Sequence, residues 1–137
     1  MRLKDLSITF HTDKTKECVE FYKKHFGAKV TFDDGEWYVV IQLETEPNAS
    51  PVYLSFQGDN EIYQREHFSG GLSLNIMVED VDACYQSIHE GGMPLSEDIT
   101  DHEWGDRAFS FYDPIGNLLY IYSERPLHEK YKDAVKE

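Results

Sequence analysis

Several features that mark large classes of protein are scarce in this sequence. Only two cysteines occur, Cys18 and Cys84, and no Cys-x-x-Cys pair is present, so we expect neither a disulfide framework nor a thiolate metal site. No apolar run approaches the roughly 18 residues of a membrane span. The first residues also lack the apolar stretch of a signal peptide. We therefore expect a cytoplasmic protein with no membrane partner.

Basic residues are also scarce. The 13 Lys and Arg residues face 26 Asp and Glu residues, which gives a net charge of −13. Nucleic acid is excluded as a partner, because its phosphates would be repelled and no basic stripe is present. Two interpretations of the acidity stay open. The charge serves solubility, or it attracts cationic ligands, since negative clefts concentrate positive partners.

What the sequence does contain is a repeat. Leu6–Phe10 alternates apolar and polar residues, and Leu72–Ile76 repeats this pattern 66 positions later. At the same offset Cys18 corresponds to Cys84. Each copy reads as a strand, an amphipathic helix and three further strands. The repeat predicts an α+β fold of duplicated βαβββ modules. Their curved mixed sheets would surround a cleft, with the helices on the outer face.

Composition and turn residues predict the boundaries. The modules are expected at 1–57 and 72–124, separated by a polar connector at 58–71 in which we allow a short helix over 61–67, and followed by a charged tail at 125–137 with a short surface helix. Strands after the first of each module are expected near 29–32, 37–43, 52–57, 94–97, 107–112 and 118–123.

Capping residues predict where the helices begin and end. Thr12 or Asp13 would cap the first helix and Gly27 would end it, whereas Asp80 would cap the second, which stops at Gly91 and Gly92. The run 113–117, Asp-Pro-Ile-Gly-Asn, predicts a tight hairpin before the last strand.

Alternation also predicts the two faces of each sheet. Apolar residues expected against the helices are Leu6, Ile8, Phe10, Leu72, Leu74, Ile76, Leu119 and Ile121. More polar or aromatic residues expected on the concave face are Ser7, Thr9, His11, Tyr53, Ser55, Gln57, Ser73, Asn75, Met77, Leu118, Tyr120 and Tyr122.

Three stretches of this sequence resemble the vicinal oxygen chelate superfamily, which includes glyoxalase I, extradiol dioxygenases, and the fosfomycin- and bleomycin-resistance proteins. Phe21–Gly27 is similar to the end of its first helix and Val78–Ala83 to the start of its second. Trp104–Phe109, followed by Asp113–Asn117, resembles its closing hairpin. The resemblance covers about residues 4–124 and rests on order, spacing and duplication.

The resemblance implies positions for a divalent metal, which the enzymes of this superfamily hold with His, Gln or Glu on the first and last strands of each module. The matching positions here are Ser7, Ser55, Ser73 and Tyr120. Hydroxyl groups are poor ligands for Zn²⁺ or Fe²⁺ compared with imidazole and carboxylate. We therefore expect no metal, no cofactor and no catalytic residue. His11, on the cleft side, and His67 and His102, in loops, are the residues that would rebuild a metal site elsewhere.

Aromatic, hydroxyl and amide residues instead favour a binding cleft, since rings stack on planar groups and attract cations. The candidate ligand-binding residues are Trp37, Tyr53, Ser55, Ser73, Asn75, Trp104, Arg107 and Tyr120. The alternative is that the rings only fill the core. Among the relatives, the bleomycin-resistance type is most similar in character, and Glu103–Arg107 is similar to a stretch that borders its drug groove. Arg107 would orient the ligand or the fold, paired with Asp106 or Glu103.

Two main hypotheses follow. The first is a metal-independent protein that sequesters a planar or cationic organic compound, with an antibiotic as one candidate. The second is a metal-dependent lyase or dioxygenase with a non-standard metal site. A dimer that keeps the fold without an important ligand is a third. The resemblance implies a homodimer, whose modules pair within one chain or swap across two, and the ligand stays open.

Overall fold

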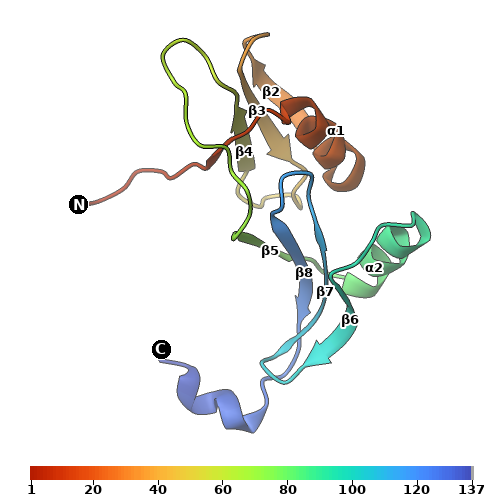
Figure 1. Ribbon diagram of the computed structural model, residues 1–137. Helices are drawn as coiled ribbons and strands as arrows, with labels where there is room; N and C mark the ends of the chain where they lie inside the picture. Colours follow the sequence, from red (N-terminus) through yellow and green to blue (C-terminus); the bar gives the residue numbers. More distant parts are fainter. Residues whose placement is uncertain (137) are drawn as a thin grey trace. The chain divides into compact units, whose positions relative to one another are not determined.

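The computed structural model describes residues 1–136 and divides into two compact units, Met1–Ser69 and Gly70–Glu137. Each unit contains one strand, one helix and three further strands, in that order (Figure 1). Each set of strands forms one four-stranded mixed sheet. The α+β fold and the duplication predicted from the repeat are therefore confirmed.

The first unit builds its sheet in the order β1-β4-β3-β2, with β1 parallel to β4 and the other neighbours antiparallel. Its elements are β1 (Thr9–His11), α1 (Thr15–Phe26), β2 (Lys29–Asp33), β3 (Tyr38–Leu43) and β4 (Val52–Gln57). Because β1 and β4 are parallel, their carboxyl ends lie at the same edge of this sheet.

The second unit repeats this topology as β5-β8-β7-β6, again with one parallel pair, β5 and β8. Its elements are β5 (Ser73–Met77), α2 (Val81–Glu90), β6 (Glu97–His102), β7 (Asp106–Tyr112), β8 (Leu118–Glu124) and the 3₁₀ helix η1 (Glu129–Ala134). The short helix expected in the tail is thus present as η1.

The helix ends follow the predictions in three of four cases. Gly27 ends α1 with a φ of 56°, in the left-handed region that glycine favours, and α2 ends at Gly91. Asp80 caps α2, because its Oδ1 accepts a hydrogen bond of 3.0 Å from the Ala83 amide. The predicted cap of α1 is wrong. Lys14 occupies that position without a side-chain bond, since the Thr12 hydroxyl accepts from the Lys14 amide, before the helix begins.

Three predictions about the chain's path are also wrong. Residues 61–67 form no helix. The chain makes a local turn instead, in which the Asn60 side chain accepts from the Ile62 and Tyr63 amides and the Asn60 amide donates to the Tyr63 carbonyl. The strand expected near 94–97 lies at 97–102, where its register with β7 runs from Glu97 to His102. Leu6 does not face a helix: it precedes β1 and is 77% exposed.

The core of each unit lies between its helix and one face of its sheet. In the first unit α1 packs against β3 and β4, with Tyr22, Ile41 and Phe56 fully buried. In the second unit α2 packs against β7 and β8, with Phe109 and Leu119 fully buried. Burial of such a side chain stabilises the fold by about 1.5–3 kcal/mol. Because residues alternate between the two faces of a strand, these buried positions also determine which residues lie on the opposite face of each sheet.

The hairpin between β7 and β8 closes as predicted. The Asp113 side chain accepts from the backbone amides of Ile115 and Asn117, and from the Asn117 side chain at 2.7 Å. Gly116 takes a φ of 86°, as the turn requires.

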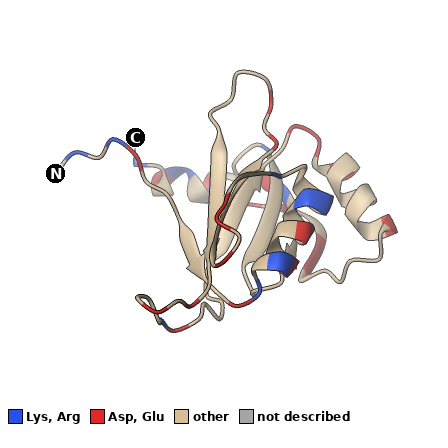
Figure 2. Ribbon diagram, turned by 90° about the horizontal axis from the view of Figure 1, so that it is seen from above, with Lys and Arg blue, Asp and Glu red and all other residues tan. Residues whose placement is uncertain are grey.

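Charge is spread unevenly over the elements. In Figure 2 the ribbon of α1 carries both basic (blue) and acidic (red) positions, whereas acidic positions recur along the loops. Among residues 1–136, no helix combines the length and apolar character needed to cross a bilayer.

Candidate functional site

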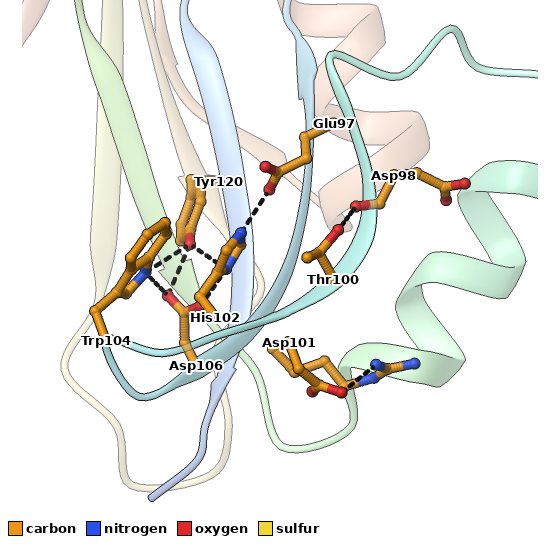
Figure 3. A network of polar contacts seen from close by, with 9 residues as sticks. Glu97, Asp98, Thr100, Asp101, His102, Trp104, Asp106 and Tyr120 are labelled. Atoms are coloured by element: carbon orange, nitrogen blue, oxygen red, sulfur yellow. Dashed lines mark hydrogen bonds and ion pairs between the residues drawn. The ribbon is translucent and has the colours of Figure 1, made fainter. Parts of the chain in front are cut away.

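A connected group of five side chains lies on the face of the second sheet opposite α2. We call this group the His102 network; its members are Glu97, His102, Trp104, Asp106 and Tyr120 (Figure 3). Its placement follows from the alternation of β7. Phe109 faces α2, where it contacts Tyr85, so Asp106 and Ala108 point to the other side. His102 joins them because it pairs with Asp106 across the sheet.

Asp106 is the centre of the network, and it is only 8% exposed. Its Oδ1 lies 2.7 Å from His102 Nδ1. Its Oδ2 accepts from the Tyr120 hydroxyl at 2.7 Å and from Trp104 Nε1 at 3.1 Å. The other nitrogen of His102, Nε2, lies 3.1 Å from Glu97 Oε1. A protonated imidazole that donates to both carboxylates satisfies this arrangement.

The surroundings of the network shift two pKa values. Burial by itself lowers the pKa of His102, but the hydrogen bonds to Asp106 and Glu97 outweigh it and raise the pKa above its usual value. Burial, followed by the hydrogen bond to Asp106, raises the pKa of Tyr120 to about 12. The environment thus favours the protonated forms of His102 and Tyr120. This suits a rigid scaffold better than proton abstraction from a substrate.

Trp104 is held in one orientation and is nevertheless open to a ligand. One face of its indole stacks on His102, with ring centroids 4.1 Å apart and planes 10° apart. Its Nε1 is held by Asp106 and lies 3.3 Å from the Tyr120 hydroxyl. The residue is still 52% exposed. Since His102 covers one face, the open surface is the other face and the rim.

A shallow cleft of about 360 Å³ lies beside this open indole. We call it the Trp104 cleft; its lining residues are Asn75, Trp104, Asp106, Tyr120 and Tyr122. Strands β5, β7 and β8 supply four of them, because Asn75 on β5 pairs with Tyr120 on β8 and Asp106 begins β7. Trp104 comes from the turn between β6 and β7. The cleft therefore combines three rings, one amide and one carboxylate on a single sheet face.

A larger cleft of about 550 Å³ lies in the first unit. We call it the Trp37 cleft; it is lined by Phe32, Asp34, Trp37, Tyr38, Gln57, Tyr63 and Arg65. The Arg65 guanidinium sits 5.4 Å from the centroid of the Tyr63 ring. A cation is thus already in place, which disfavours a second one. The residues that line the Trp104 cleft, by contrast, include no Lys or Arg.

The predicted binding residues divide between these places. Asn75, Trp104 and Tyr120 come together at the Trp104 cleft, and Trp37 lines the other cleft. Ser73 is exposed on the same face of β5 as Asn75. Tyr53 is exposed and Ser55 is buried on β4, and neither is among the described residues that line the two clefts.

The expected pairing of Arg107 with Asp106 or Glu103 is wrong. Arg107 Nη2 lies 3.0 Å from Asp82 Oδ1 on α2, and Nη1 lies 3.1 Å from Asp101 Oδ2 on β6. The reason is the alternation of β7, which puts Arg107 and Asp106 on opposite faces. Glu103 forms its ion pair with Lys130.

Sequence reasoning missed three members of the network. His102 was expected in a loop, Asp106 only as a partner of Arg107, and Glu97 was given no role. Strand alternation could have identified one of them. If the strand predicted at 107–112 is started one residue earlier, Asp106 falls on the same face as Ala108 and Ser110, which is the face that carries the site.

The positions that the resemblance assigns to a metal do not fit one. Ser7 and Ser73 are exposed hydroxyls and Ser55 is a buried one, while the Tyr120 hydroxyl is engaged by Asp106. None offers the imidazole or carboxylate that a divalent transition metal prefers.

A different set of metal-ligating side chains converges in the first unit. Ligand atoms of His11, Asp59 and His67 all lie within 4.8 Å of one another. The hydrogen bond from His11, aided by one from His67 and opposed by partial desolvation, lowers the pKa of the Asp59 carboxyl. Sequence reasoning had noted both histidines as ways to rebuild a metal site, but it had not identified Asp59.

Comparison with known proteins gives consistent results. Residues 7–121 match the Glyoxalase/Bleomycin resistance protein/Dioxygenase superfamily. The "Uncharacterized protein YraH" of Bacillus subtilis (strain 168) is 30% identical over 131 residues, which cover 88% of this chain and 98% of that protein.

Solved structures show the same fold. A member of this superfamily from Sphaerobacter thermophilus DSM 20745 aligns with a TM-score of 0.64 at 22% identity, covering 89% of this chain and 98% of that one. A glyoxalase/bleomycin resistance protein/dioxygenase from Nocardioides aligns with a TM-score of 0.67 at 14% identity, covering 91% and 86%. The chain belongs to the glyoxalase/bleomycin resistance protein/dioxygenase superfamily.

Proposed function

We propose that this protein binds a planar or cationic organic small molecule at the Trp104 cleft and performs no chemistry on it. One observation carries the proposal: the indole of Trp104 is locked by His102 and Asp106, yet its outer face is open. A ring fixed before the ligand arrives loses little conformational freedom on binding, so more of the contact energy appears as affinity. An antibiotic is one candidate ligand.

The charge of the site supports a cationic group in the ligand. Glu97 and Asp106 flank one imidazolium, so the three groups together carry a net negative charge, within a chain of net charge −13. A cation placed over an aromatic face gains about 0.5–2 kcal/mol. Offset stacking of a planar ring contributes about 0.5–1.5 kcal/mol beyond the area that it buries.

We further propose that the protein is a cytoplasmic homodimer and that binding needs no metal. The hydroxyl groups at the positions where the resemblance places metal ligands support metal-independent binding. Light scattering on the purified protein tests the dimer, for which a mass of one 16.0 kDa chain would be the contrary result.

The binding test is a calorimetric titration of the protein with metal-free bleomycin and with a set of smaller planar cations. We expect Trp104→Ala to weaken binding about tenfold or more, which corresponds to a loss of about 1.4 kcal/mol. Trp37→Ala is the matched control, since it removes the other tryptophan from a different cleft and should leave affinity unchanged. Equal affinity of wild type and Trp104→Ala for every compound that binds would remove this ring from the proposal.

A second candidate function is a metal-dependent lyase or dioxygenase. It is favoured by one observation, the convergence of His11, Asp59 and His67 in the first unit. Its test is turnover of a glyoxalase substrate and of a catechol by protein loaded with Zn²⁺, Ni²⁺, Mn²⁺ or Fe²⁺. Activity that disappears on chelation and returns with one of these ions would favour it over simple binding.

A further inference from the structure

Two imidazoles and one carboxylate meet at the carboxyl-terminal edge of the first sheet. His11 ends β1, Asp59 follows the end of β4 by two residues, and His67 lies in the segment that closes the first unit. His11 Nε2 lies 2.7 Å from Asp59 Oδ1, and His67 Nε2 lies 3.1 Å from Asp59 Oδ2. One carboxylate therefore stands between the two rings, with one oxygen directed at each.

The backbone holds all three ligand positions together. The Thr12 amide donates to the Gln57 carbonyl at 2.9 Å, which ties the end of β1 to the end of β4. The Phe68 amide donates to the His11 carbonyl at 2.7 Å, which ties the segment of His67 to β1. The His11 side chain is 10% exposed and that of His67 is 35% exposed. The cluster is thus positioned by main-chain bonds and stays reachable from solvent.

We propose that His11, Asp59 and His67 bind a divalent transition-metal ion of the Zn²⁺ type. Imidazole nitrogen and carboxylate oxygen are the ligands that such ions prefer in proteins. A tetrahedral ion with bonds of about 2.0–2.1 Å holds its ligand atoms about 3.3 Å apart. One ligand atom from each of the three residues already lies within 4.8 Å of the other two, so side-chain shifts of about 1.5 Å or less bring the set to this spacing.

Three protein ligands leave a fourth coordination position for water or a small molecule. The cluster lies near the Trp37 cleft, because His11 pairs with Gln57 across the sheet and Gln57 pairs with Tyr38, and both of these line the cleft. The inference does not depend on binding at the Trp104 cleft, and it supplies the site that the second candidate function requires.

The second unit shows that the cluster is not a requirement of the fold. His11 corresponds to Met77 in the repeat, and Met77 occupies the equivalent end of β5, opposite Tyr122. A methionine is thus compatible with this backbone position. His11→Met is accordingly a conservative way to remove one ligand.

The experiment is a calorimetric titration of the full chain, stripped of metal, with ZnCl₂ and then with NiCl₂ and CoCl₂. We expect one ion per chain, and affinity about a hundredfold weaker in His11→Met, Asp59→Asn and His67→Gln. His89→Gln is the control, because this exposed histidine lies on α2 outside the cluster, and it should bind as wild type does.

Titration of the wild type with Co²⁺, followed by NMR, covers the case in which a variant does not fold. We expect the ring signals of His11 and His67 to be broadened before those of His25, His89 and His128. Failure to bind any of the three ions would overturn the proposal. Binding that the three substitutions leave unchanged, or broadening of all histidines alike, would do the same and would indicate an adventitious ion only.

Discussion

The Tyr120 hydroxyl donates a 2.7 Å hydrogen bond to Asp106 Oδ2, and this bond joins β8 to the start of β7 on the face that carries the site. Since the same oxygen also accepts from Trp104 Nε1, Tyr120 helps to fix the indole that lines the cleft. A bond to an ionised carboxylate contributes more than one between neutral groups, about 1.5–3 kcal/mol. The same hydrogen bond therefore contributes both to the orientation of Trp104 and to the stability of the second unit.

Tyr120→Phe should lower the free energy of unfolding by about 1–2 kcal/mol, because it removes this donor and leaves a buried carboxylate with fewer partners. Urea denaturation at pH 7 measures the change. Tyr122→Phe is the control, since Tyr122 lines the same cleft but its hydroxyl is outside the His102 network. Equal losses of unfolding free energy in the two variants would show that the hydrogen bond from Tyr120 to Asp106 contributes no more stability than any tyrosine hydroxyl on this face.

Stability should fall as the pH rises above about 6.5 because of His102. Its pKa is raised in the folded state, so the folded chain holds this proton more tightly than the unfolded chain does. The resulting stabilisation is complete below the unfolded value of about 6.5 and is lost as the pH rises through the folded value. Urea denaturation over this range measures it. His102→Gln should flatten the profile and His89→Gln should not; an unchanged profile in His102→Gln would contradict the assignment.

Substitution of the N-cap residue should lower the stability of the protein at α2 but not at α1. Asp80→Ala should destabilise the protein by about 1 kcal/mol, because the carboxylate that accepts from the Ala83 amide is lost. Lys14→Ala, at the matching position of α1, should change little, since Lys14 makes no side-chain capping bond. Thermal and urea unfolding of both variants measure the difference, and a larger effect at Lys14 would reverse the interpretation.

Arg107→Gln should leave binding at the Trp104 cleft unchanged, contrary to the role expected for Arg107 from the sequence. Its partners Asp82 and Asp101 lie on the other side of β7 from Asp106, and an exposed pair of this kind contributes about 0–1 kcal/mol to stability. The same bleomycin and planar-cation titrations measure the affinity, with Trp104→Ala as the variant expected to lose it. A marked loss in Arg107→Gln would place the ligand nearer to α2.

The sequence by itself determined the fold, because the fold depends on periodic and local signals. The glycine after α1 and the Asp80 cap act within a few residues of chain, and both are confirmed. The duplicated topology that the repeat predicted is confirmed as well. Strand edges were less predictable. The start of β1 at Thr9 and of β6 at Glu97 depends on the partner strands with which they pair.

The composition of the candidate sites was decided only by the tertiary structure. The sequence indicated Trp104, Tyr120 and Asn75 as binding residues, but nothing in the spacing of Glu97, His102 and Asp106 shows that they meet at one imidazole. Likewise His11 and Asp59 are 48 residues apart and come into contact only because β1 lies parallel to β4. A hydrogen bond or a metal site requires atoms within a few ångströms of one another, and register between distant strands, rather than local pattern, sets those distances.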